Sequence, residues 1–209
     1  EHMNLTKTDF KEFLLCNKCL WVKKKRPEDY IEGEFSLFLK KLIKDGYEVE
    51  SYVKQLFSEG IEVTGSKEEL LDKTKKYIEE GHTMFQATFE TGSGLFAKVD
   101  VLKHNPETNT WNLYEIKASS EIKTDIKHNF IKDITFQTIV AESSGITIDK
   151  SFIVYINKEY RRQGDINIHS LFIVEDVTDQ VNEVKDTVKT EIEVALEMLG
   201  RDELSLNGC

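Results

Sequence analysis

The chain has 209 residues, a mass of 24.2 kDa and a formal net charge of −10 at pH 7. Hydrophobic residues make up 39% of the sequence and charged residues 32%, a balance that excludes a disordered chain and a membrane protein. The longest apolar runs span only four or five residues, and no apolar segment follows the N-terminus as in a secretory signal. We therefore expect a cytoplasmic protein with a sizeable core and no interaction with membranes.

The charge is distributed unevenly along the chain. Between residues 5 and 26, seven basic residues outnumber two acidic ones, whereas between residues 175 and 203 ten acidic residues outnumber three basic ones. A general nucleic-acid binder usually carries a basic surface, which an acidic protein lacks. The basic stretch can nevertheless face a polyanion while the acidic stretch faces away. Solvated helix faces explain both stretches equally well.

The first third of the chain predicts helices bounded by capping residues and glycines. They cover residues 10–21, 35–44, 47–57 and 67–81. Thr8-Asp9 caps the first helix, and Gly46 separates the second from the third. Ser66 followed three residues later by Glu69 is a capping box that opens the fourth.

The rest of the chain alternates strands with helices. The expected elements are strands 84–91, 95–103 and 111–117, a helix 130–143, strands 151–157 and 168–174, and a helix 178–199. The first two strands are joined by Gly92-Ser93-Gly94, a tight-turn sequence. This order predicts an α/β fold in which a mixed sheet carries helices. We expect one domain over residues 4–175, with the acidic amphipathic helix of residues 176–209 packed on it.

Charged side chains fall on two of these strands. Asp100 lies on the second strand, and Glu115-Ile116-Lys117 ends the third. Strand side chains alternate between faces, so Glu115 and Lys117 point to the same side. Carboxylates brought together in this way suit a hard divalent cation, and a nearby lysine can orient or deprotonate a metal-bound water. A surface salt bridge between Glu115 and Lys117 is the alternative.

In the order and placement of these motifs, the sequence resembles the PD-(D/E)XK nuclease superfamily, and within it the RecB-type exonucleases, including the CRISPR-associated ones. Lys98-Val99-Asp100 resembles the strand with the family's first acidic residue, and Tyr114-Glu115-Ile116-Lys117 resembles its (D/E)-x-K strand. The resemblance covers residues 5–175. It implies a restriction-endonuclease-like core of helix, three strands, helix and strand, with extra N-terminal helices and a long C-terminal helix.

The resemblance also implies the roles of individual residues. Glu50, which follows Gly46 in a sequence similar to the family's first-helix motif, would be a metal ligand with Asp100, Glu115 and the Ile116 carbonyl. Lys117 would be catalytic. Gln137 matches the glutamine of a Q-x-x-x-Y motif that holds DNA near the site, although Ala141 stands at the tyrosine position. The implied cofactor is Mg²⁺ or Mn²⁺.

The cysteines carry a second resemblance. The chain has three cysteines, an odd number that argues against a disulfide framework. Residues 5–21 resemble the opening of iron–sulfur RecB-type exonucleases, in which a cysteine matching Cys16 binds a [4Fe–4S] cluster. Such a cluster takes four thiolates, and only Cys209 stands near the C-terminal end, so we expect a cluster only in a longer chain with downstream domains. The alternative is a pair of helix cysteines, one buried and one exposed.

The sequence thus predicts a metal-dependent deoxyribonuclease, in particular an exonuclease acting on single-stranded DNA or DNA ends. The alternative is an idle nuclease fold that serves a larger protein as a DNA-binding or scaffolding module. The absent tyrosine, the incomplete cysteine set and the negative charge favour this alternative. The presence of all the acidic residues and the lysine opposes it.

Overall fold

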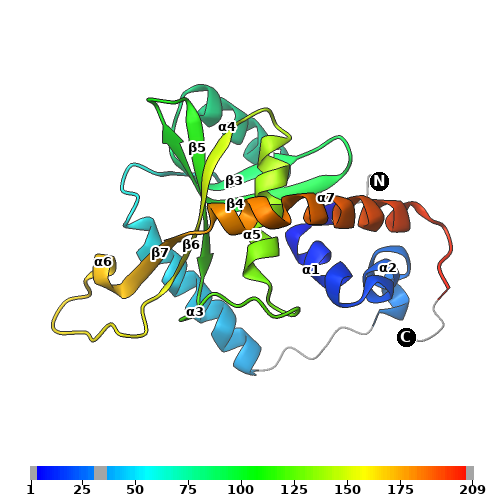
Figure 1. The fold of residues 1–209 in the computed structure, drawn as a ribbon, viewed down its shortest axis with the longest axis horizontal. Coiled ribbons are helices and arrows are strands. Elements are labelled where there is room, and N and C mark those ends of the chain that lie inside the picture. The colour runs from blue at the N-terminus through cyan, green and yellow to red at the C-terminus, as the bar shows by residue number, and fades with distance from the viewer. Residues whose placement is uncertain (1–3, 31–36, 206–209) are drawn as a thin grey trace.

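A computed structural model describes residues 4–30 and 37–205, with the backbone alone for residues 37–43. The N-terminal part comprises β1 (Leu5–Thr6), α1 (Lys7–Leu15), α2 (Asn17–Lys25), the 3-10 helix η1 (Pro27–Asp29), α3 (Leu37–Lys54), β2 (Ile61–Glu62) and α4 (Lys67–Glu79). It is followed by β3 (Met84–Glu90), β4 (Leu95–Asn105), β5 (Thr110–Lys117), α5 (Phe130–Glu142), β6 (Ile148–Ile156), α6 (Ile168–Leu171), β7 (Phe172–Asp176) and α7 (Thr178–Gly200). Figure 1 shows these elements along the chain.

Within the described residues, the strands form one mixed sheet. Its order is β2-β3-β4-β5-β6-β7, and the short β1 pairs with β4. Strands β3, β4 and β5 form an antiparallel meander, whereas β5 and β6 are parallel and are connected through α5. The predicted α/β fold and its core order of helix, three strands, helix and strand are confirmed.

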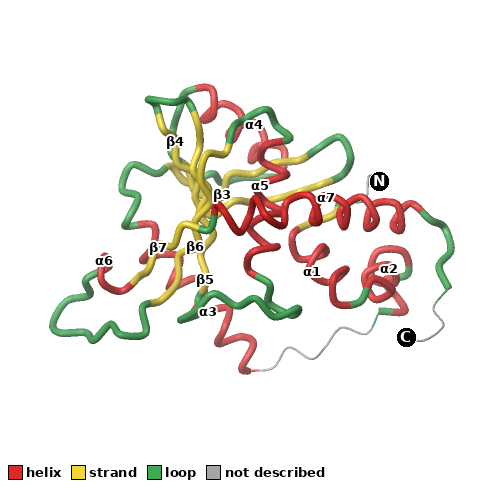
Figure 2. Tube along the Cα trace, viewed as in Figure 1, coloured by secondary structure: helices red, strands yellow, loops and turns green. Residues whose placement is uncertain are grey.

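Helices cover the two faces of the sheet unequally, as Figure 2 shows. The larger hydrophobic cluster joins α1, α2, α5 and α7 to one face, with Phe136 of α5 stacked on Phe10 of α1 at 5.2 Å between ring centres. The smaller cluster packs Val53 of α3 against the other face, where Tyr114 and Val154 lie. The sheet is therefore buried on both sides. None of the helices in the described part of the chain has both the length and the apolar character needed to cross a bilayer.

The predicted helix boundary at Gly46 is wrong, because α3 runs without interruption from Leu37 to Lys54. Residues 35 and 36 of the predicted second helix lie outside the described part. A glycine inside a helix costs about 1 kcal/mol relative to alanine, but it does not force the helix to end. Packing of the C-terminal half of α3 on the sheet, through Val49 and Val53, outweighs that cost. The strand predicted over residues 168–174 is also shorter, because its first residues form α6.

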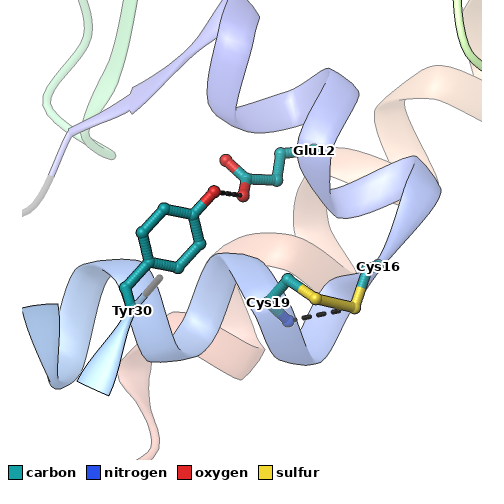
Figure 3. The surroundings of a disulfide bond; sticks show 4 residues. All are labelled: Glu12, Cys16, Cys19 and Tyr30. Carbon is teal, nitrogen blue, oxygen red and sulfur yellow. Dashed lines mark hydrogen bonds between the residues drawn. A yellow bond between two sulfur atoms is a disulfide. The ribbon is translucent and has the colours of Figure 1, made fainter. Parts of the chain in front are cut away.

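The single helix predicted over residues 10–21 is two helices, α1 and α2, that meet at Cys16. Cys16 has an extended backbone, with φ −155° and ψ 94°, and caps the N-terminus of α2. The Cys19 backbone N–H donates to Cys16 Sγ at 3.2 Å, and the two sulfurs form a disulfide (Figure 3). This local bridge was not predicted, because the odd cysteine count argued only against a disulfide framework, whereas two cysteines three residues apart on a first helical turn can pair locally. The expectation of one buried and one exposed cysteine was also wrong, since both are half-buried.

Asp9 ties α1 to α2. Its carboxylate accepts hydrogen bonds from the backbone and hydroxyl of Thr6, at 3.0 and 2.7 Å, and so completes the capping box of α1. Thr6, rather than the predicted Thr8-Asp9 pair, is thus the capping residue. Lys24 of α2 lies 2.7 Å from the same carboxylate, which is only 4% exposed. Burial by itself would raise the pKa of Asp9, but the hydrogen bonds from Lys24 and Thr6 outweigh it and hold this pKa below its usual value.

Asp9→Asn should therefore lower the free energy of unfolding by roughly 1–3 kcal/mol at pH 7. A carboxyl whose pKa is lower in the folded state stabilises the fold above its unfolded-state pKa of about 4, and this contribution disappears as the pH falls through the folded-state pKa. Urea unfolding of both proteins at neutral and acidic pH should show the difference shrinking below about pH 4. The exposed Asp72, changed to Asn, is the control and should behave like wild type at each pH. A difference for Asp9→Asn that stayed constant with pH would contradict this account.

Candidate active site

A cavity of about 320 Å³ opens where the middle of α3 and the end of β5 approach the start of α1. Its lining residues come from four separate elements and the segment after β5: Lys7, Gly46, Tyr47, Glu50, Asp100, Glu115, Ile116, Lys117 and Ala118. The three predicted acidic residues, the predicted lysine and the Ile116 backbone thus share one cavity. Two predicted site residues do not line it: Gln137, which is buried in α5, and Cys16, which lies between α1 and α2.

Strand β5 supplies Glu115 and Lys117 from the same face, as alternation predicts. Lys117 Nζ donates to Glu115 Oε1 at 2.7 Å. Glu115 is only 1% exposed, so this pair is buried and is not the surface salt bridge of the alternative interpretation. Lys117 also forms an ion pair with Asp133, a buried residue in the first turn of α5.

Two charged partners of this pair, Lys7 and Asp133, were not predicted from the sequence. Lys7, the first residue of α1, lies with its Nζ 2.7 Å from Glu115 Oε1. Pairing of β1 with β4, in which Leu5 lies opposite Leu95, carries Lys7 to the cavity. The excess of basic residues near the N-terminus was the one available signal, but it did not single out Lys7. Asp133 looked like an ordinary helix residue, because its importance depends on a contact across 16 positions of sequence.

Asp100 lies where the side-chain alternation of two strands breaks. Phe85 and Val101 pack in the smaller cluster, whereas Ala87 and Val99, two positions away on the same strands, pack in the larger one. Gln86, between Phe85 and Ala87, has a left-handed backbone with φ +59°. This irregularity places the side chains of Gln86 and Asp100 together. Regular alternation of side chains along a strand could not predict which way they point.

Gln86 links Asp100 to Glu50. Its Nε2 donates to Glu50 Oε1 at 3.0 Å and lies 3.4 Å from Asp100 Oδ1. The other Asp100 oxygen accepts the Ile116 backbone N–H at 2.8 Å. Glu50 is also paired with Lys54 of the same helix at 3.0 Å. The amide of Gln86 thus holds two carboxylates from different elements beside each other.

Gln137 is fully buried and donates from Nε2 to Glu115 Oε2 at 2.7 Å. A side chain with no exposed surface cannot contact DNA directly, so the predicted contact of Gln137 with DNA is wrong. Gln137 instead fixes the carboxylate of Glu115. Ala141, one turn further along α5, lies within the larger hydrophobic cluster.

The electrostatics of the cavity separate its two central carboxyls. Burial and the adjacent charge of Glu115 raise the pKa of Asp100 to about 7. Burial would also raise the pKa of Glu115, but the cations of Lys117 and Lys7 hold it well below its usual range. Burial lowers the pKa of Lys117, yet the charges of Glu115 and Asp133 raise it above its usual value overall. Glu115 and Asp133 therefore favour the cationic form of Lys117.

The predicted metal ligands at the cavity are the carboxylates of Glu50, Asp100 and Glu115 and one backbone carbonyl. All of them are oxygen donors, which hard divalent cations prefer. Nothing in residues 4–30 and 37–205 already brings three His, Cys, Asp or Glu side chains into a group that could hold a metal. Lysine ammonium and glutamine amide groups occupy carboxylate oxygens of Glu50 and Glu115 instead. At Asp100, burial and the charge of Glu115 outweigh the Lys7 and Lys117 cations and the Ile116 N–H and raise the pKa, an imbalance that a bound cation would relieve. The residues thus fit Mg²⁺ or Mn²⁺ by donor type.

The candidate iron–sulfur ligand lies elsewhere. Cys16 stands between α1 and α2, close to the Glu12–Tyr30 hydrogen bond of 2.7 Å that Figure 3 shows. Its sulfur is bonded to that of Cys19, so Cys16 is not a free thiolate here. Cys209 lies outside the described residues.

Comparison with known proteins supports the fold. No protein-family model matches the chain, and no curated protein matches it. Among solved structures, it is similar to a candidate exonuclease from Eubacterium rectale, with a TM-score of 0.55 and 15% identity, over 100% of this chain and 86% of the other. An alkaline exonuclease from Laribacter hongkongensis aligns over 95% of this chain and 92% of its own, with 14% identity and a TM-score of 0.44. The first likeness shows the restriction-endonuclease-like nuclease fold.

The left-handed backbone of Gln86 predicts an unusual order of variant stabilities. A non-glycine residue with positive φ costs about 1 kcal/mol, which glycine avoids. Gln86→Gly should therefore be more stable than Gln86→Ala by about 1 kcal/mol in urea unfolding, although both variants lose the amide. At the exposed Lys98 of β4, the control position, alanine should be the more stable replacement. If alanine were the more stable replacement at both positions, the proposed backbone strain at Gln86 would be wrong.

Proposed function

We propose that this protein is a metal-dependent nuclease that hydrolyses phosphodiester bonds of DNA. The observation that supports this most directly is the convergence of Glu50, Asp100 and Glu115 on one cavity, with Lys117 beside them. Glu50 lies on a helix and Lys117 at the end of a strand, and the two residues are 67 positions apart in sequence. Such a set, gathered beside the central strands β4 and β5, suits metal-assisted hydrolysis of a phosphodiester.

In this proposal, Glu50, Asp100, Glu115 and the Ile116 carbonyl hold Mg²⁺ or Mn²⁺. When bound, the ion would activate the attacking water and neutralise charge on the leaving oxygen. Lys117, kept protonated by Glu115 and Asp133, stabilises negative charge that builds on the phosphate. Gln137 and Lys7 fix the Glu115 carboxylate from two sides, which limits the reorganisation needed during the reaction.

We further propose that the substrate is single-stranded DNA or a DNA end and that the enzyme is an exonuclease. The fold likeness to the Eubacterium rectale protein, itself a candidate exonuclease, supports this choice. Lys7 and Lys11 of α1 add positive charge next to the carboxylates, with Lys11 Nζ 3.9 Å from Asp133 Oδ2. This charge would attract a phosphate backbone to a protein that is acidic overall.

A second candidate, an idle nuclease fold that binds DNA or serves as a scaffold, is favoured by one observation. Both oxygens of Glu115 already have protein partners, because Lys7 and Lys117 bind Oε1 and Gln137 binds Oε2. A carboxylate satisfied in this way can serve stability alone. In that case the cavity would bind no metal.

Cleavage of end-labelled DNA in Mn²⁺ tests the main proposal. Glu115→Gln and Lys117→Met should each lower the rate at least about a hundredfold, since each removes charge needed at the reacting phosphate. Glu183→Gln and Lys189→Met, on the exposed side of α7, are matched controls and should cleave like wild type. A chelator should abolish cleavage, and mononucleotides released from one end before fragments appear would identify an exonuclease. Unchanged cleavage by Glu115→Gln would contradict the proposal.

Calorimetric titration with Mn²⁺ separates the enzyme from the idle fold. The wild-type protein should bind Mn²⁺ at a site that Asp100→Asn removes, because this change deletes a carboxylate charge facing the cavity. Glu183→Gln is again the control and should bind like wild type. Binding that is absent, or equal in wild type and Asp100→Asn, would favour the idle fold.

A further inference from the structure

We infer that the Gly46–Tyr47 step of α3 is a docking site for an unpaired nucleotide, with Tyr47 stacking on its base and Gly46 admitting its sugar–phosphate backbone. The inference rests on the proposed function and specifies its substrate as a strand with unstacked bases. Both residues line the cavity that holds Glu50, Asp100 and Glu115. A strand bound there would present its phosphate to those carboxylates.

Gly46 stands in the interior of an 18-residue helix, where glycine is less stable than alanine. Nothing among the described residues explains it, because a methyl group at Gly46 would meet no described atom within 4 Å apart from its chain neighbours and its own helix backbone. Its φ does not lie in the left-handed region either. What the glycine provides is open space over the helix backbone, on the side that faces the cavity. A glycine without a side chain lets a ligand approach the helix backbone closely.

Tyr47 is the most exposed large hydrophobic residue recorded for the described residues, at 70% of its surface. The other side chains that line this cavity are mostly charged, so the exposed aromatic ring gains little from packing there. Aromatic rings exposed beside a polar groove are what single-stranded nucleic acids stack on, whatever their sequence. A base pair within a duplex has no free face to offer, so this ring selects an unpaired base.

The surroundings of Tyr47 leave room for the base. A second depression, of about 340 Å³, shares Tyr47 and Glu50 with the catalytic cavity and continues along α3 past Ser51 to Lys54. Tyr47 therefore stands between two hollows, one of which holds the carboxylates. A nucleotide whose phosphate enters the first hollow can place its base against the ring and into the second.

Binding of a short fluorescent oligothymidylate to the full 209-residue protein, measured by anisotropy in Ca²⁺, tests this inference. Tyr47→Ala should weaken binding about 5- to 150-fold, whereas Tyr47→Phe should retain it, since stacking needs the ring and not the hydroxyl. An oligomer of the same length that lacks bases should bind wild type and Tyr47→Ala equally. Val194→Ala, an exposed apolar position on α7, is the control and should bind like wild type.

Gly46→Ala provides the second, independent test. It should raise the melting temperature by about 1–4 °C, because alanine is the better helix former, and yet weaken oligonucleotide binding. Gly200→Ala, at the end of α7 and likewise free of atoms within 4 Å, is the matched control and should bind like wild type. A rise in stability together with a loss of affinity is a result that damage to the fold cannot produce.

The outcomes separate this inference from the proposed function. If wild type cleaves DNA but Tyr47→Ala and Gly46→Ala bind oligothymidylate as tightly as wild type, the docking site is wrong and the nuclease stands. Tighter binding of duplex than of oligothymidylate would also overturn the docking site. If wild type neither binds nor cleaves any oligonucleotide, the proposed function fails and this inference fails with it.

Discussion

A single buried carboxylate, that of Glu115, organises this molecule. It accepts hydrogen bonds from Lys7 at the start of α1, Lys117 at the end of β5 and Gln137 in α5. A charge removed from water in this way is costly unless cations and donors surround it. The N-terminal segment, the central sheet and the crossover helix must therefore meet at this point. The need to neutralise Glu115 also keeps the cations of Lys7 and Lys117 in place, where a phosphate in the cavity would meet them.

The second constraint is the break in alternation on β3 and β4. Regular strands would send Gln86 and Asp100 to one face or the other of the sheet, where two hydrophobic clusters already lie. The left-handed backbone of Gln86 instead brings Asp100 next to Glu50 of α3. Strained backbone is often found where a site needs a direction that regular structure cannot supply. Here it joins helix α3 to the meander through the contacts of Gln86 with Glu50 and Asp100.

The N-terminal helices have a role that their amphipathic pattern does not reveal. The β1–β4 pairing and the Phe10–Phe136 stacking fix α1 against the sheet and α5. Trp21 of α2 donates its indole N–H to the Arg201 backbone carbonyl at 3.2 Å, which links α2 to the end of α7. The first and last helices of the described chain are thus held side by side, as Figure 1 shows. Lys7 reaches Glu115 only because this arrangement is fixed.

The sequence by itself determined the fold class and the placement of Glu115 and Lys117 on one face of a strand, because the period of apolar residues and the alternation along a strand are local properties. It also predicted Glu50 and Asp100 as members of the site, through their resemblance to known motifs. The tertiary structure alone decided that Lys7, Gln86 and Asp133 contact the charged residues of the site, since each reaches them through contacts between distant segments. It also showed that Gly46 lies within a helix, because packing of α3 on the sheet outweighs the tendency of glycine to end a helix. Burial, likewise, made Gln137 a partner of Glu115, since whether a polar side chain faces solvent or the core depends on the helices packed around it.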